Sequence, residues 1–96
     1  MRAQSEQVFA CLTRNLKAAG ASWSDVIKMN GYMVRMTPEA VTAYREVRTR
    51  YLDPRKMPAS TLVGVDRLVH EDLLLEVEVV AVLGERVRPA RKKKKR

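Results

Sequence analysis

Residues 26–36 limit the fold of this chain more than any other stretch of the sequence. Apolar side chains occupy odd and even positions there alike, namely Ile27, Met29, Tyr32, Met33, Val34 and Met36. Successive side chains of a strand point to opposite faces of a sheet, so this density predicts a strand with both faces covered. Gly31 interrupts the run and predicts either a bulge or the close approach of another backbone.

An amphipathic helix is expected on the amino-terminal side of this strand. Over residues 3–19 the apolar side chains recur at spacings of three and four, and Gly20 supplies a stop. This helical face consists of Val8, Phe9, Leu12, Leu16 and Ala19. Cys11 lies inside the same pattern, so we expect it to pack in the core and not to act as a nucleophile.

A second helix is expected directly after the strand. Thr37 can accept a backbone N–H bond, Pro38 fits the first helical position, and a carboxylate follows at the positive end of the helix dipole. Asp53-Pro54 should end the helix. Its buried stripe is Val41, Tyr44, Val47 and Tyr51.

Two further strands complete the predicted domain, at residues 60–65 and 73–83, and they could form an antiparallel pair. The predicted class is therefore α+β, with helices on one face of the sheet and the element order α-β-α-β-β. Three strands make a thin sheet, so a domain of this size would expose part of the sheet and at least one edge.

The positive charge of the chain is concentrated at its carboxyl end. The formal net charge is +8, but residues 85–96 hold eight of the nineteen basic residues and a single acid. We therefore expect a nearly neutral folded domain over residues 1–84 and a disordered basic tail over residues 85–96. A lysine run without interleaved aromatic side chains favours a solubilising tail over nucleic-acid binding.

The remaining composition argues for a cytoplasmic protein without a membrane segment. A single cysteine excludes a disulfide framework, and no apolar run approaches the ~20 residues that span a bilayer. The motifs of dinucleotide, nucleoside triphosphate and zinc sites are absent from the sequence. His70 has no second histidine with which to form a metal site, so we expect a surface turn residue, no metal and no cofactor.

The last predicted strand carries the one chemically suggestive pattern. Alternation places Glu76 and Glu78 on one face, whereas Leu75, Val77 and Val79 take the other. One interpretation of the two acids is structural: a solvated strand face, or a salt bridge to an arginine such as Arg67. The other is functional: a general acid/base or water-positioning carboxylate in a cleft between subunits.

Three segments of the sequence, taken in order, carry a family resemblance. Residues 4–9 lead to Asn15-Leu16 and Ala18-Ala19-Gly20, and residues 25–28 open the first strand. Pro58-Ala59-Ser60-Thr61-Leu62-Val63-Gly64-Val65 is followed by Arg67-Leu68 and by Leu75-Glu76-Val77-Glu78-Val79-Val80-Ala81. Together they resemble the RidA family, also known as YjgF/YER057c/UK114 or endoribonuclease L-PSP, whose carboxyl-terminal signature is P-A-R-S/T-x-V-x-V…L…(V/I)-E-I-E-x-(I/V)-A.

The resemblance implies a chorismate-mutase-like two-layer fold with a mixed sheet, assembled as a homotrimer with a site at each subunit interface. It also implies a deaminase that hydrolyses reactive enamine or imine metabolites and releases ammonia and a 2-keto acid. In this family an arginine grips the substrate carboxylate and a glutamate positions water.

By position in the motifs, the catalytic glutamate falls on Glu76, with Glu78 as its companion, and backbone N–H groups around Thr61 and Leu62 would hold the substrate's anionic group. The family's arginine is replaced by Ser60, and its site asparagine falls at Arg45. Because of these two departures, the resemblance does not identify the substrate.

Family members begin with two or three strands that lead to an S-G-Q segment, whereas this chain begins at the first helix. We therefore expect a domain whose amino-terminal strands are missing, either through a late start or because the gene is a remnant. Two alternatives to catalysis stay open: a non-catalytic small-ligand-binding protein of the same fold and, less favoured, nucleic-acid association through the basic tail.

Overall fold

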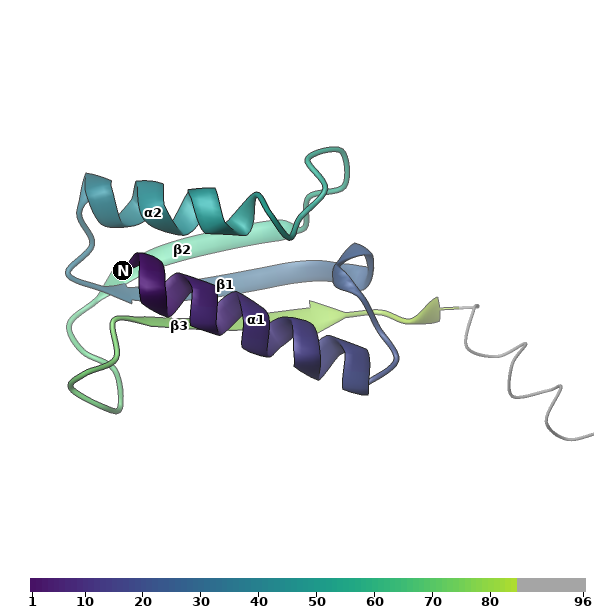
Figure 1. Cartoon of the computed structure of the whole chain (residues 1–96), viewed down its shortest axis with the longest axis horizontal. Helices are drawn as coiled ribbons and strands as arrows, with labels where there is room; N and C mark the ends of the chain where they lie inside the picture. The colour runs from purple at the N-terminus through teal and green to yellow at the C-terminus, as the bar shows by residue number, and fades with distance from the viewer. Residues whose placement is uncertain (85–96) are drawn as a thin grey trace, which may run out of the picture.

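A computed structural model describes residues 1–84, which form a three-stranded sheet with two helices packed on one of its faces (Figure 1). The elements in chain order are α1 (Arg2–Ala18), a 3-10 turn (Trp23–Asp25), β1 (Val26–Val34), α2 (Pro38–Arg48), β2 (Ala59–Val65) and β3 (Leu75–Ala81). The predicted α+β class and its element order are confirmed. The predicted tail, residues 85–96, lies outside the described residues.

The sheet has the strand order β2-β1-β3. β1 pairs in parallel with β2 and antiparallel with β3, so the sheet is mixed as expected. The predicted antiparallel pairing of residues 60–65 with residues 73–83 is wrong, because β1 lies between these two strands. Since α2 connects β1 to β2, the chain crosses over and enters β2 in the same direction as β1.

α2 begins where the local sequence favours a helix start. α2 has Thr37 as its N-cap, whose hydroxyl accepts the Ala40 N–H at 3.1 Å, and Pro38 occupies the first turn. The helix ends at Arg48, earlier than Asp53-Pro54 predicted. After Arg48 the backbone continues in tighter turns, in which the Arg50 N–H donates to the Val47 carbonyl and the Tyr51 N–H to the Arg48 carbonyl, each at 3.0 Å.

An aromatic cluster joins the two helices above the sheet. Phe9 is fully buried, and its ring centroid lies 5.5 Å from Trp23, 5.8 Å from Tyr44 and 5.4 Å from Tyr51. The buried cluster around Phe9 also contains Met29 and Met33 of β1 together with Val47, Leu52 and Leu75. Cys11, by contrast, is exposed on α1, so its expected core position is wrong; it faces away from the stripe that contains Phe9 and Leu16.

Gly31 lies beneath Tyr44 of α2 and beside Leu62 of β2. A Cβ atom at this position would lie 2.8 Å from Leu62 Cδ1 and 3.4 Å from the Tyr44 hydroxyl. The predicted close approach is therefore made by side chains and not by a backbone, and the irregularity in β1 lies between Val26 and Lys28. The pKa of Tyr44 is raised by burial, and the nearby Arg48 guanidinium offsets only part of this rise.

No helix within residues 1–84 is long and apolar enough to cross a membrane. This portion of the chain also contains no group of three or more His, Cys, Asp or Glu side chains placed to hold a metal ion. His70 is an exposed residue of the loop before β3.

Substitution of Gly31 tests this close packing. Gly31→Ala should lower the free energy of unfolding by about 1 kcal/mol, the low end for overpacking, because the added methyl group displaces the flexible end of Leu62 and lies against the Tyr44 hydroxyl. Gly64→Ala is the matched control on the neighbouring strand: its Cβ would meet only ordinary contacts at 3.6–3.9 Å, so a change within about 0.5 kcal/mol is expected. Urea unfolding of both variants measures the difference, and equal effects would contradict this packing.

Candidate functional site

The face of the sheet opposite the helices carries the two acids that the sequence singled out. Along β3, Glu76 and Glu78 are exposed, whereas Leu75 is buried and Val77 and Val79 are partly buried. The predicted alternation is therefore confirmed. We call this exposed surface of β1, β2 and β3 the open face.

Glu78 is held by two side chains of β1. The Tyr32 hydroxyl donates a hydrogen bond to Glu78 Oε2 at 2.7 Å, and Asn30 Nδ2 donates to the same oxygen at 3.4 Å. These donors stabilise the ionised carboxylate and lower the pKa of Glu78, the bond from Tyr32 being the larger cause. In turn, the pKa of Tyr32 is raised, chiefly because its hydroxyl donates a hydrogen bond to the Glu78 carboxylate, and also by burial and by the negative charge of that carboxylate. Arg67, named above as an example of an arginine that could pair with these acids, instead donates to the carbonyl of Leu68 at 3.2 Å.

Glu76 differs from Glu78 in having no such partner. It lies next to Tyr32 in the β1–β3 register, but Tyr32 gives its hydrogen bond to Glu78. Among residues 1–84, the Glu76 carboxylate makes no hydrogen bond or ion pair with another side chain. One carboxylate of the pair is thus engaged, and the other is available to a ligand or a water molecule.

β2 places the predicted substrate-binding residues on both faces of the sheet. Ser60, Thr61 and Leu62 pair with Met29, Asn30 and Gly31 of β1. Paired residues project to the same face, so Thr61 shares the open face with Asn30 and Glu78. Ser60 and Leu62 project toward the helices, on the face of the buried Met29. A single chain therefore does not bring Ser60 and Glu76 together.

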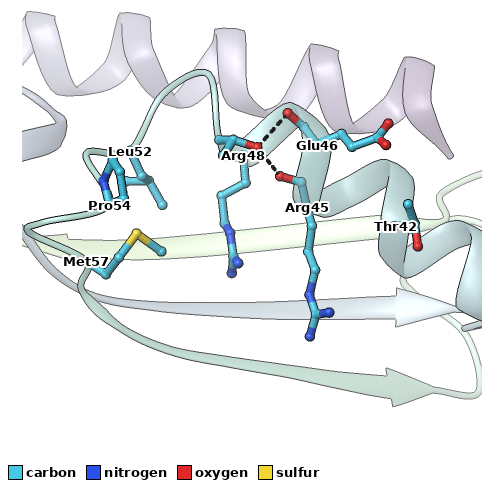
Figure 2. Close-up of a pocket in the computed structure, with 8 residues that line it drawn as sticks. Thr42, Arg45, Glu46, Arg48, Leu52, Pro54 and Met57 are labelled. Carbon is cyan, nitrogen blue, oxygen red and sulfur yellow. Dashed lines mark hydrogen bonds between the residues drawn. The ribbon is translucent and has the colours of Figure 1, made fainter.

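Arg45 belongs to the helical layer. It projects from α2 into a pocket whose lining includes Arg48, Leu52 and Met57 (Figure 2), on the other side of the sheet from Glu76. The structure consequently separates the predicted residues into three places. Glu76, Glu78 and Thr61 lie on the open face, Ser60 and Leu62 project from β2 toward the helices, and Arg45 lines the pocket beside α2.

Sequence reasoning missed Asn30 and Tyr32. Their spacing within β1 placed them on one face of the strand, which is the only signal that the sequence offers. Their contact with Glu78 depends on the register that pairs Asn30 with Glu78 and Tyr32 with Glu76.

Comparison with known proteins agrees with this arrangement of elements. The family described as Endoribonuclease L-PSP matches residues 1–83 of the chain. The chain belongs to this family. It is the RidA family, so the resemblance predicted from the sequence motifs is confirmed.

A relative and two solved structures illustrate the membership. A RutC family protein of Pyrococcus horikoshii is 38% identical over 78 residues, which are 81% of this chain and 59% of the relative. The Rid family protein YyfB of Yersinia pestis superposes with a TM-score of 0.78 at 32% identity, covering 86% of this chain and 62% of YyfB. RidA of Psychrobacter sp. PAMC 21119 gives a TM-score of 0.76 at 29% identity, covering 86% and 64%. The chain thus spans about 60% of the length of these family members.

The contact between Tyr32 and Glu78 can be tested by titration. In Tyr32→Phe the pKa of Glu78 should rise toward its ordinary value of 4.5, because the main donor to its carboxylate is gone. Carboxyl carbon NMR across the acid range measures this pKa. Tyr51→Phe is the matched control, since that ring packs against Phe9 in the core, and the pKa of Glu78 should be unchanged.

Stability should follow the same titration. The folded pKa of Glu78 lies below its unfolded value, so its contribution is present above about pH 4.5 and is lost as the pH falls through the folded pKa. Tyr32→Phe should therefore lose less stability over that acid range than the unmodified chain. An unchanged Glu78 pKa in this variant would refute the hydrogen bond.

Proposed function

We propose that this chain is the subunit of a RidA-like hydrolase that removes ammonia from reactive enamine or imine metabolites in the cytoplasm. One observation carries the proposal: on the open face, Glu76 is an exposed carboxylate without a side-chain partner, next to an engaged Glu78. Membership of the family adds support, because the RidA of Psychrobacter shares this fold at 29% identity.

Glu76 would act as the base that orients water. Its carboxylate accepts a hydrogen bond from a water molecule and takes a proton as the water oxygen adds to the imine carbon. That proton then passes to the nitrogen, which gives a carbinolamine. Transfer of the carbinolamine's hydroxyl proton to the nitrogen, relayed by the same carboxylate, lets the C–N bond break, so that ammonia leaves as the carbonyl forms. Glu78, held by the Tyr32 hydroxyl, would be the positioning residue beside Glu76.

The outer edge of β2 would hold the substrate's anionic group. β2 pairs with β1 on one side only, so alternate N–H groups of Ser60, Thr61 and Leu62 face away from β1 without a strand partner among residues 1–84. Such N–H groups can donate to a carboxylate. The Ser60 hydroxyl adds a neutral donor where the family has an arginine, which weakens the grip on a carboxylate.

Assembly into a homotrimer would bring these groups together. Ser60 and Glu76 lie on opposite faces of one sheet, so a complete site needs the β2 edge of one chain against the open face of another. The open face also exposes apolar side chains suited to an interface, with Val63 40% and Val80 51% exposed.

Imine hydrolysis provides the direct test. Imines generated in situ by an amino-acid oxidase are supplied to the chain, and the rate of keto-acid release is compared with the rate without protein. Glu76→Gln should lower the protein-dependent rate by about a hundredfold or more, because an amide cannot accept the proton. Glu78→Gln should have a smaller effect, since it removes only a neighbouring charge.

Glu71→Gln is the matched control for these variants, because Glu71 is an exposed acid in the loop before β3. Its rate should equal that of the unmodified chain. Keto-acid release that is no faster with the protein than without it would refute catalysis, and a fully active Glu76→Gln would refute the assigned role.

The proposed assembly makes a separate prediction. Sedimentation equilibrium should show a trimer for the unmodified chain and a monomer for Val80→Asp, because a charge on the open face would be buried at the interface. Val69→Asp introduces the same charge at a loop residue that is 87% exposed, and it should stay trimeric. A monomeric unmodified chain at high concentration would contradict the trimer.

A non-catalytic protein that binds a small ligand is the second candidate. The serine at position 60 supports this candidate, because the family's arginine would have supplied a charged contact to the substrate. Saturable binding of a keto acid that raises the melting temperature, combined with no acceleration of imine hydrolysis, would decide for this candidate.

A further inference from the structure

A pocket of about 480 Å³ lies between α2 and residues 52–57, on the helical side of the sheet (Figure 2). Its volume falls within the range of about 300–1,000 Å³ that is usual for small-molecule sites. It is separate from Glu76, which projects from the opposite face of the sheet. We call it the α2 pocket.

Two guanidinium groups dominate the polar side of the α2 pocket. Arg45 and Arg48 stand three residues apart on α2, a spacing that places both on one helical face. Figure 2 shows both side chains extending from the helix in the same direction. Two like charges at this spacing repel each other, and an anion bound between them would relieve the repulsion.

These two arginines differ in how firmly they are held. The Arg48 guanidinium carbon lies 5.7 Å from the centre of the Tyr44 ring, a cation–π contact with a buried residue that fixes its position. Arg45 makes no side-chain hydrogen bond or ion pair within residues 1–84. One guanidinium is thus pre-positioned, and the other is free to close on a ligand.

The other polar groups of the pocket do not cancel this charge. Glu46 is engaged by Arg2, and Figure 2 shows its side chain pointing away from the two arginines. The Thr49 hydroxyl donates to backbone carbonyls of α2, so its hydrogen is already used. Two positive charges are therefore available to a ligand in this pocket.

The rest of the lining is apolar. Leu52 is 5% exposed and supplies a packed wall, Met57 is 45% exposed and can adapt to a ligand, and Pro54 completes this side. An inorganic anion alone would leave this wall in contact with water. The lining therefore suits an organic anion with an apolar body.

We propose that the α2 pocket binds a small organic phosphate monoester through Arg45 and Arg48, with its organic part against Leu52 and Met57. The charge decides the class: a phosphate monoester is close to a dianion at neutral pH and offers three oxygens to planar guanidinium groups, which bind phosphate in a bidentate manner. A carboxylate or a phosphodiester carries a single charge and matches two arginines less well. The proposal does not depend on the chemistry of Glu76.

The proposal is tested by measuring the binding of phenyl phosphate to the full chain. Calorimetry gives the affinity, and NMR shifts of residues 42–57 locate the site. Arg45→Gln and Arg48→Gln should each weaken binding at least about tenfold. Arg14→Gln removes an exposed arginine from α1, outside the pocket, and should leave the affinity unchanged. Arg45 is exposed, so its variant should fold normally, and Arg48→Lys keeps the charge over Tyr44 if Arg48→Gln unfolds.

Ligand analogues separate the two halves of the pocket. Inorganic phosphate should bind more weakly than phenyl phosphate, and Met57→Ala should weaken only phenyl phosphate. Benzoate or diphenyl phosphate binding as tightly as phenyl phosphate would overturn the preference for a monoester. Absence of saturable phenyl phosphate binding, or affinity that survives both arginine variants, would overturn the site itself, whatever the outcome of the imine assay.

Discussion

The hydrogen bonding of β1 to two neighbours is the constraint on which the rest of this structure depends. Its pairing with β2 on one side and β3 on the other fixes which residues of the two outer strands face the helices and which face outward. Met29 and Met33 project into the core, and Asn30 and Tyr32 project to the open face. A shift of one residue in either pairing would turn the side chains of that outer strand to the opposite face of the sheet.

The same strand makes the two glutamates unequal. Because Asn30 and Tyr32 both donate to Glu78, the nearly identical positions of a Glu-x-Glu pattern acquire different chemistry. Glu76 keeps its acceptor capacity free. Physical asymmetry between neighbouring carboxylates is a common basis for dividing catalytic and positioning roles, and here it arises from the register of one strand pair.

The sequence predicted those features that depend on local chemistry. Thr37 and Pro38 defined the start of α2, and alternation placed Glu76 and Glu78 on one face. The neighbours of β2 could not be predicted, because short apolar strands are compatible with several partners and their order depends on the whole sheet. The bond between Tyr32 and Glu78 was missed for the same reason, since it exists only in one register.

The α2 pocket could not be predicted from the sequence for a different reason. Arg45 and Arg48 read as ordinary charged residues on an exposed helical face, and the early end of α2 allows residues 52–57 to form a wall beside them. The motif comparison assigned a role to Arg45 but gave no reason to consider Arg48. Its contact with the Tyr44 ring depends on how α2 packs over Gly31.

The position of β1 in the first third of the chain, ahead of both its partner strands, also has a kinetic consequence. Its partners are distant in sequence, since Lys28 pairs with Ala59 and Tyr32 pairs with Glu76. Contacts between distant residues form slowly, because the chain entropy of closing large loops opposes them. The two helices can form early from local contacts, whereas the sheet cannot be completed on the ribosome until β3 has left the exit tunnel.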